Sequence, residues 1–95
     1  MQNCIFADNI TEIEKSEFES WTRLVVITIP DGVTKIGSRA FAKCTSLKSI
    51  SIPDSVKEIK EEAFWGCDEL KAVIMSDSTT IKEGAFPPQA EIIYR

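Results

Sequence analysis

The sequence has no histidine, and its three cysteines include no C-x-x-C pair. A nucleophilic cysteine would therefore lack its usual neighbouring base, and a structural zinc ion would lack its usual set of four nitrogen and sulfur ligands. Glycine is also scarce. The four glycines are isolated at 32, 37, 66 and 84 and form no glycine-rich phosphate loop. These absences argue against cysteine catalysis, zinc binding and nucleotide binding, and we expect no cofactor.

Long apolar runs and clusters of positive charge are missing as well. No stretch of 18 apolar residues occurs, and the first residues, MQNCIFADNI, show neither the basic region nor the apolar region of a signal peptide. The 11 basic residues are scattered among 15 acidic ones, which gives a formal net charge of −4. We therefore expect no membrane insertion and no nucleic acid partner, since phosphate binding needs clustered positive charge.

The sequence repeats itself with a step of 23 residues. The segment IPDGVTKIGSRAFAKC at 29–44 returns as IPDSVKEIKEEAFWGC at 52–67. The same step aligns apolar residues along the chain, among them Leu24, Leu47 and Leu70, and Phe18, Phe41 and Phe64. Fixed-period similarity of this kind is typical of a solenoid, in which stacked units share one core. We predict one domain over 1–95, with about four units at 1–23, 24–46, 47–69 and 70–95.

Each unit predicts the same short elements. LKSISIP at 47–53 alternates apolar and polar residues as a half-buried strand does, and its proline ends the strand. VKEI at 56–59 predicts a second short extended segment. KEEAFWGC at 60–67 has helix formers before a glycine and predicts one or two helical turns. One coil is thus expected to contain a strand, a turn, a short extended segment and a short helix.

The pattern L-x-x-I-x-I-P-x-x-V-x-x-I-x-x-x-A-F-x-x-C-x-x-L, nearly complete at 47–70, resembles the BspA-type leucine-rich repeats, a family common in bacterial surface proteins and some protists. The resemblance covers essentially the whole chain. It implies an α/β solenoid, a right-handed leucine-rich-repeat superhelix with a parallel strand ladder on one face and short turns or helices on the other. It also suggests a cell-surface or secreted protein, although the chain shows no signal peptide.

Two sets of side chains recur at the repeat step and could carry chemistry. The aspartates would form a column along the stacked coils, at Asp8, Asp31, Asp54 and Asp77. A cation site gathers its oxygens around one point, whereas an aspartate after a proline serves to begin a turn, so we predict turn residues and no metal site. Cys44 and Cys67 lie close enough for a disulfide. The equivalent position holds Trp21 and Gln89 in the end units, which favours buried thiols, with the disulfide as an alternative.

The outward side of the strand ladder is the predicted binding surface. Its side chains are small and nearly uncharged, which suits another protein or a surface ligand better than a small polar substrate. By strand alternation, the residues predicted to bind are Ile5, Val26, Thr28, Ser49, Ser51, Ala72 and Ile74. Trp65 has no aromatic counterpart at Ala42, so we predict either an exposed contact or packing against the neighbouring coil.

The resemblance implies a non-catalytic module that binds another protein or a surface ligand, and we predict that the chain is not an enzyme. One alternative is a structural piece of a longer repeat array without a binding site of its own. Another is a hydrolase that uses a carboxylate pair, because 15 acidic residues allow many pairs. The apolar strands CIF and IIYR near the two ends have open edges, so self-association through them is also expected.

Overall fold

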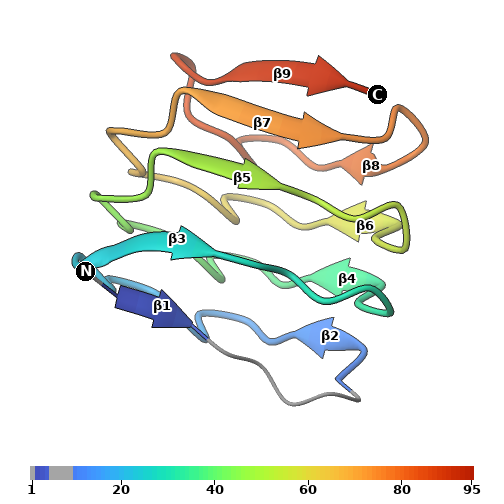
Figure 1. The fold of residues 1–95 in the computed structure, drawn as a ribbon, viewed down its shortest axis with the longest axis horizontal. Coiled ribbons are helices and arrows are strands. Elements are labelled where there is room, and N and C mark those ends of the chain that lie inside the picture. Colours follow the sequence, from blue (N-terminus) through green and yellow to red (C-terminus); the bar gives the residue numbers. More distant parts are fainter. Residues whose placement is uncertain (1, 5–9) are drawn as a thin grey trace.

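A computed structural model describes residues 10–95 and the backbone of residues 2–4. Within these residues the regular elements are β-strands, and the chain winds as a parallel β-solenoid of about four turns (Figure 1). The chain follows the near side from left to right and returns along the far side while it climbs, so the coil is right-handed, as expected (Figure 1).

The near side of the solenoid carries the longer strands. These are β1 (Gln2–Cys4), β3 (Leu24–Ile27), β5 (Ser49–Ser51), β7 (Ala72–Met75) and β9 (Glu91–Tyr94). They form two parallel sheets, β1-β3 and β5-β7-β9. Ile50 and Val73 lie opposite each other and are buried, whereas Ser51 and Ile74 lie opposite each other on the exposed side. The predicted alternation is therefore confirmed.

The far side carries strands of two residues each, β2 (Glu12–Ile13), β4 (Lys35–Ile36), β6 (Glu58–Ile59) and β8 (Thr80–Ile81). They form one continuous parallel sheet in the order β2-β4-β6-β8. Glu12, Lys35 and Glu58 stack in register and alternate in charge, and the Glu58 carboxylate also lies 3.5 Å from Lys60 Nζ and 3.8 Å from Lys82 Nζ. Pairs of this kind support the stacking of neighbouring coils.

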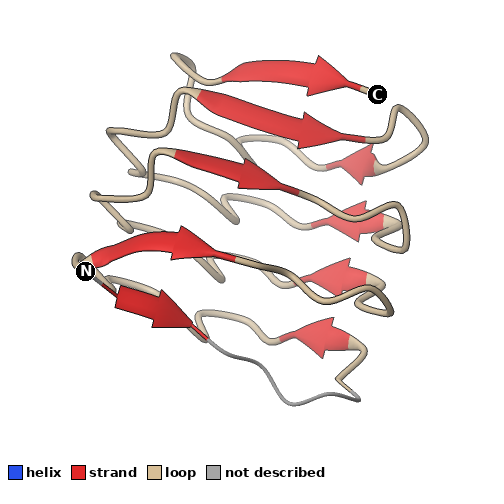
Figure 2. Cartoon of the chain, viewed as in Figure 1, coloured by secondary structure: helices blue, strands red, loops and turns tan. Residues whose placement is uncertain are grey.

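The helix predicted at 60–67 is wrong, and with it the α/β class: the described residues contain no helix, and this segment is a pair of tight turns (Figure 2). An α-helix needs each N–H to donate within its own segment. Here the Phe64 N–H donates across to the Ala85 carbonyl of the next coil, at 2.7 Å. Left-handed backbone at Glu62 and Gly66 turns the chain between such bonds. Local helix propensity is thus overridden by hydrogen bonding between coils.

The core is one continuous column because equivalent apolar residues stack from coil to coil. Four phenylalanine rings form a ladder, with centroids 5.3 Å apart for Phe18 and Phe41, 5.0 Å for Phe41 and Phe64, and 5.1 Å for Phe64 and Phe86. The rings of each pair lie within 15° of parallel. This stacked arrangement shows why the repeat keeps a phenylalanine in this position of each unit.

The last coil is shorter than the repeat predicts. Glu91 of β9 pairs with Ala72 of β7, which lies only 19 residues earlier in the chain. Gln89 occupies the position of the repeated cysteine. Its Nε2 donates to the Cys67 carbonyl at 3.0 Å and to the Leu70 carbonyl at 3.1 Å. A polar side chain therefore satisfies carbonyl groups at the turn where the coil has been shortened.

Candidate functional site

The predicted binding residues lie on one surface, which we call the strand face: the outward side chains of β3, β5, β7 and β9 together with Thr28. Val26 is 50% exposed and Ile74 is 38% exposed. Thr28, Ser49 and Ser51 are exposed and Ala72 is half-buried. Ile5 lies outside the described residues. The structure thus brings together six of the seven residues that sequence alternation selected.

Two further residues complete the strand face. Ile93 is 41% exposed and lies in register with Ile74, which in turn lies opposite Ser51. Glu91 occupies the neighbouring row, opposite Ala72. The 23-residue step misses both because the last coil is short. The alternating segment EIIYR was the available signal, since its first, third and fifth residues share one side of a strand.

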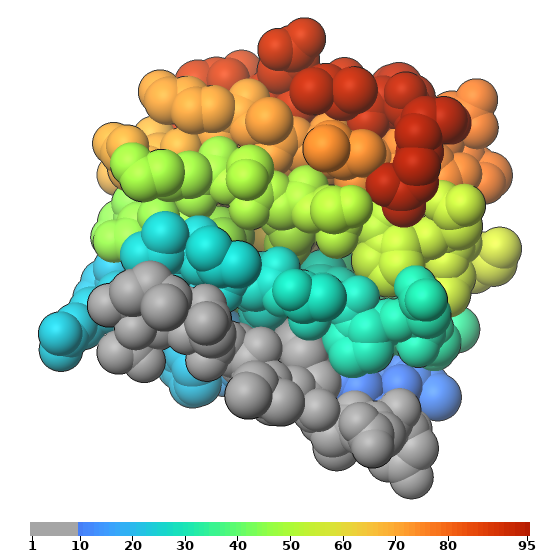
Figure 3. All heavy atoms as spheres, in the orientation of Figure 1, coloured from blue at the N-terminus to red at the C-terminus, as the bar shows by residue number. Residues whose placement is uncertain are grey.

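A shallow pocket of about 250 Å³ lies at the end of the strand face, between the chain after β3 and the chain after β5. Arg95 closes one side of it. Its guanidinium lies 3.1 Å from Asp54 Oδ1, 3.4 Å from Ser51 Oγ, and within hydrogen-bonding contact of the Ile52 carbonyl. In Figure 3 the red C-terminal atoms accordingly extend down over the yellow-green coil. This cation is therefore already paired with groups of the chain itself.

The repeated aspartates lie in turns, as predicted, but the turns are closed by other groups. The Val33 N–H donates to the Pro30 carbonyl at 3.3 Å. The Ser55 hydroxyl accepts from the Gly32 N–H at 3.1 Å and donates to the Val33 carbonyl at 2.8 Å, which ties two coils together. Asp31, Asp54 and Asp77 are exposed, and Asp8 lies outside the described residues. Where the structure describes the chain, no three acidic, cysteine or histidine side chains are grouped as a metal site.

The two repeated cysteines are buried free thiols, which confirms the favoured interpretation. Cys44 Sγ donates to the Phe18 carbonyl at 3.3 Å, and Cys67 Sγ donates to the Phe41 carbonyl at 3.0 Å. The neighbouring Cys44 thiol and burial in the apolar core together raise the pKa of Cys67. A buried thiol that stays protonated is a poor nucleophile, so Cys67 serves packing.

Trp65 is both exposed and packed against the preceding coil. Its ring is 44% exposed, and it also packs against the preceding coil, with Arg39 Cζ 5.0 Å and Lys43 Nζ 5.5 Å from the ring centroid. Arg39 in turn pairs with Glu19 and Glu62, each at 2.9 Å. Cation–π contacts of this geometry favour a fixed ring position. The exposed tryptophan is therefore held in place by cationic side chains of this chain.

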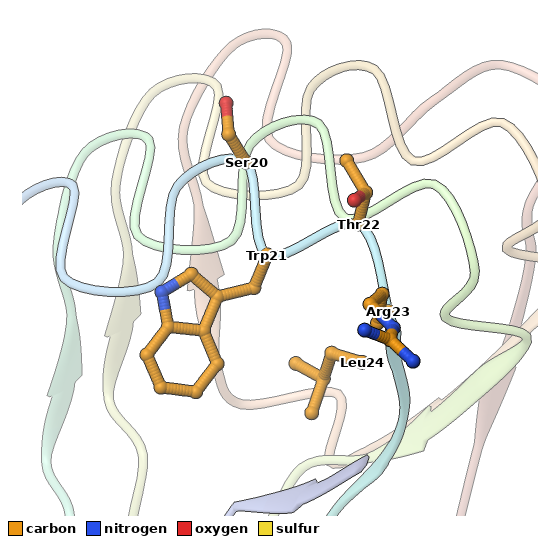
Figure 4. Close-up of a pocket in the computed structure, with 5 residues that line it drawn as sticks. All are labelled: Ser20, Trp21, Thr22, Arg23 and Leu24. Carbon is orange, nitrogen blue, oxygen red and sulfur yellow. The ribbon is translucent and has the colours of Figure 1, made fainter. Parts of the chain in front are cut away.

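Two pockets lie on the turn side of the solenoid, where the tight turns follow one another. One, of about 290 Å³, is lined by residues 20–24. The Trp21 and Leu24 side chains lie on one side of the backbone of this segment, and the Ser20 and Thr22 side chains point the other way (Figure 4). The second, of about 420 Å³, is lined partly by Lys43 and Trp65. Trp21 is 47% exposed, with its ring edge-on to Phe18 at 4.7 Å. Both pockets are open hollows on the surface.

Glu19 gives no support to the hydrolase alternative. A general acid that acts near neutral pH needs a raised pKa. The hydrogen bond from Arg39 instead lowers the pKa of Glu19, so the Glu19 carboxylate favours its ionised form. Glu19 and its neighbours form a structural ion-pair network along the turn side.

Comparison with known proteins gives one match. A protein-family model described as BspA type leucine rich repeat region (6 copies) matches residues 1–92. No curated protein and no solved structure matches the chain. Among the described residues, no helix has the length and apolar character that crossing a membrane requires.

Proposed function

Because the chain belongs to the BspA-type leucine-rich repeat family, we propose that it is a non-catalytic module that binds another protein through its strand face. Repeat scaffolds of this kind are generally non-enzymatic and present extended surfaces to partners. The same family argument makes a cell surface the proposed location. The partner class follows from the chemistry of the face itself.

Exposed apolar side chains on an otherwise hydroxyl-rich surface carry the proposal. Val26, Ile74 and Ile93 are each between 38% and 50% exposed, and the serines and threonine beside them add hydrogen-bonding groups without charge. Exposed apolar side chains that line one surface mark protein interaction sites more often than small-molecule sites. The pocket described at the end of this face is shallow, whereas small ligands favour deep concave sites.

The partner we expect is a protein that presents a flat, weakly charged surface with apolar side chains of its own. The charged groups nearest the face lie at its borders, where Glu91 ends one row and Arg95 pairs with Asp54. An interface with an apolar centre and a polar rim fits this distribution. A strongly charged partner fits it poorly, because its charges would lose water without gaining an opposite charge.

Charge insertion on the strand face tests the proposal. Affinity capture with the immobilised chain, followed by quantitative mass spectrometry, should yield a protein that Val26→Lys and Ile74→Lys each lose by at least about tenfold, because each places an unpaired cation in the interface. Thr80→Lys is the matched control, since it adds the same charge to an exposed strand residue on the far side, next to Glu58. Equal capture by all three variants would move the site away from the strand face, and the structural-segment alternative would then gain.

A further inference from the structure

The last strand, β9, has one edge without a neighbouring strand among the described residues (Figure 1). The N–H groups of Glu91 and Arg95 donate inward, to the carbonyls of Lys71 at 2.8 Å and Met75 at 3.0 Å. Backbone groups of successive strand residues point to alternate edges. The N–H and C=O groups of the intervening Ile92 and Tyr94 therefore point to the open edge.

The side chains of this strand form a self-complementary pattern. Glu91, Ile93 and Arg95 share the outward side, with opposite charges on either side of an isoleucine that is 41% exposed. On the other side Ile92 is half-buried and Tyr94 is 55% exposed. When such a segment is turned end for end, each charge meets its opposite and each apolar residue meets another apolar residue.

We propose that this edge binds a second copy of the chain, with the two β9 strands antiparallel and centred on Ile93. Ile92 of each copy then lies opposite Tyr94 of the other, and these two pairs exchange N–H···O=C bonds. The two Ile93 side chains meet at the closely spaced position between them. Glu91 of each copy lies opposite Arg95 of the other.

The register follows from hydrogen bonding and charge together. The backbone groups of the open edge are used only in registers that place Ile92 or Tyr94 of one copy opposite Ile92 or Tyr94 of the other. Centring the pair on Ile92 or on Tyr94 keeps fewer strand residues opposite one another and matches neither charge. Head-to-tail pairing with β1 would place Glu91 and Arg95 against a strand, Gln2–Cys4, that carries no charged residue. The antiparallel pair centred on Ile93 satisfies both the backbone hydrogen bonds of the open edge and the pairing of opposite charges.

Arg95 must change partners for this pairing to form. In the single chain its guanidinium lies on Asp54, in a contact in which the Arg95 side chain is 39% exposed and the Asp54 side chain is 75% exposed. Exposed ion pairs contribute little to stability, so the exchange of one carboxylate for another is nearly neutral. The exchange also breaks the contacts of Arg95 with the Ser51 hydroxyl and the Ile52 carbonyl, and this loss opposes pairing. The pairing would join two three-stranded sheets into one of six strands, a result that does not depend on what the strand face binds.

Sedimentation equilibrium of the full chain from about 10 µM to about 1 mM covers the range of a small, transient interface. We expect a monomer that becomes a dimer at the upper end. Tyr94→Pro should abolish the dimer, because it removes an N–H of the open edge while leaving the bonds to β7 in place. Tyr94→Thr keeps that N–H and should dimerise. A chain that stays monomeric to about 1 mM, or that grows beyond a dimer, overturns the proposal.

A mixing experiment tests the register. Glu91→Lys places a lysine opposite Arg95, and Arg95→Glu places two glutamates opposite each other, so each variant alone should dimerise at least about tenfold more weakly than the wild type. In a 1:1 mixture, the lysine introduced by Glu91→Lys faces the glutamate introduced by Arg95→Glu, and both pairs are again opposite in charge. Recovery of wild-type association in the mixture is the expected result. Association that is unaffected by the single variants, or that is not recovered on mixing, excludes this pairing.

Discussion

Cys67 shows how a single residue that looks chemical can be structural. Its thiol is fully buried, donates to the Phe41 carbonyl, and has a pKa raised by the Cys44 thiol beside it and by burial. The repeat step and the apolar surroundings predicted this role from the sequence. The partner carbonyl could not be predicted, because it depends on how far neighbouring coils are displaced along one another.

The raised pKa of Cys67 makes stability fall at high pH. Below the unfolded-state pKa, near 8.5, the thiol is protonated in both states and its contribution to stability is constant. Above that pH the unfolded chain releases the proton and the folded chain retains it, so the free energy of unfolding falls by up to about 1.4 kcal/mol per pH unit.

Urea unfolding between about pH 7 and about pH 10 measures this effect, and we expect Cys67 to make the free energy of unfolding fall as the pH rises over this range. Cys67→Ala is the control: it is less stable at every pH, yet its stability should fall less steeply. Parallel pH profiles for the two proteins would show that the thiol ionises equally in the folded and unfolded states.

The tight turn is the element that the sequence predicted least well. Helix formers at 60–63 favoured a helix, because propensity describes an isolated segment, whereas the stacked coils direct N–H groups of this segment to the next coil. The left-handed positions carry little sequence signal. Glycine occupies one at Gly66, but Lys43 occupies the equivalent position of the coil before it, with φ of 62°.

Gly66 gives a test of this turn geometry. Its φ is 79°, and a Cβ at this position would lie 3.2 Å from Lys43 Cγ. Gly66→Ala should therefore lower the free energy of unfolding by about 1 kcal/mol in urea titrations, since left-handed backbone costs roughly 1–2 kcal/mol and the stiffer unfolded chain returns part of it. Ser20→Gly, at an equivalent position with φ of 65°, should not destabilise. A helical segment would give the opposite result, with alanine stabilising position 66.

The overall fold was largely predictable because the molecule consists of similar units stacked along one axis. Each coil contacts its neighbours, so the repeat step fixed the solenoid, the stacked phenylalanines and the inward and outward sides of the strands. The end was not predictable in this way. The step shortens to 19 residues before β9, and Ile93 therefore joined the strand face without appearing in the repeat.

Methyl NMR of the chain with its captured partner shows whether the strand face binds a protein. We predict that the methyl signals of Val26 and Ile74 shift or broaden on titration, while the indole N–H signal of Trp65 on the turn side stays unchanged. Ile59, buried on the far side, is an internal reference. Changes confined to Trp65 and the turn side, with Val26 and Ile74 unaffected, would place the binding site on the turn side and exclude the strand face.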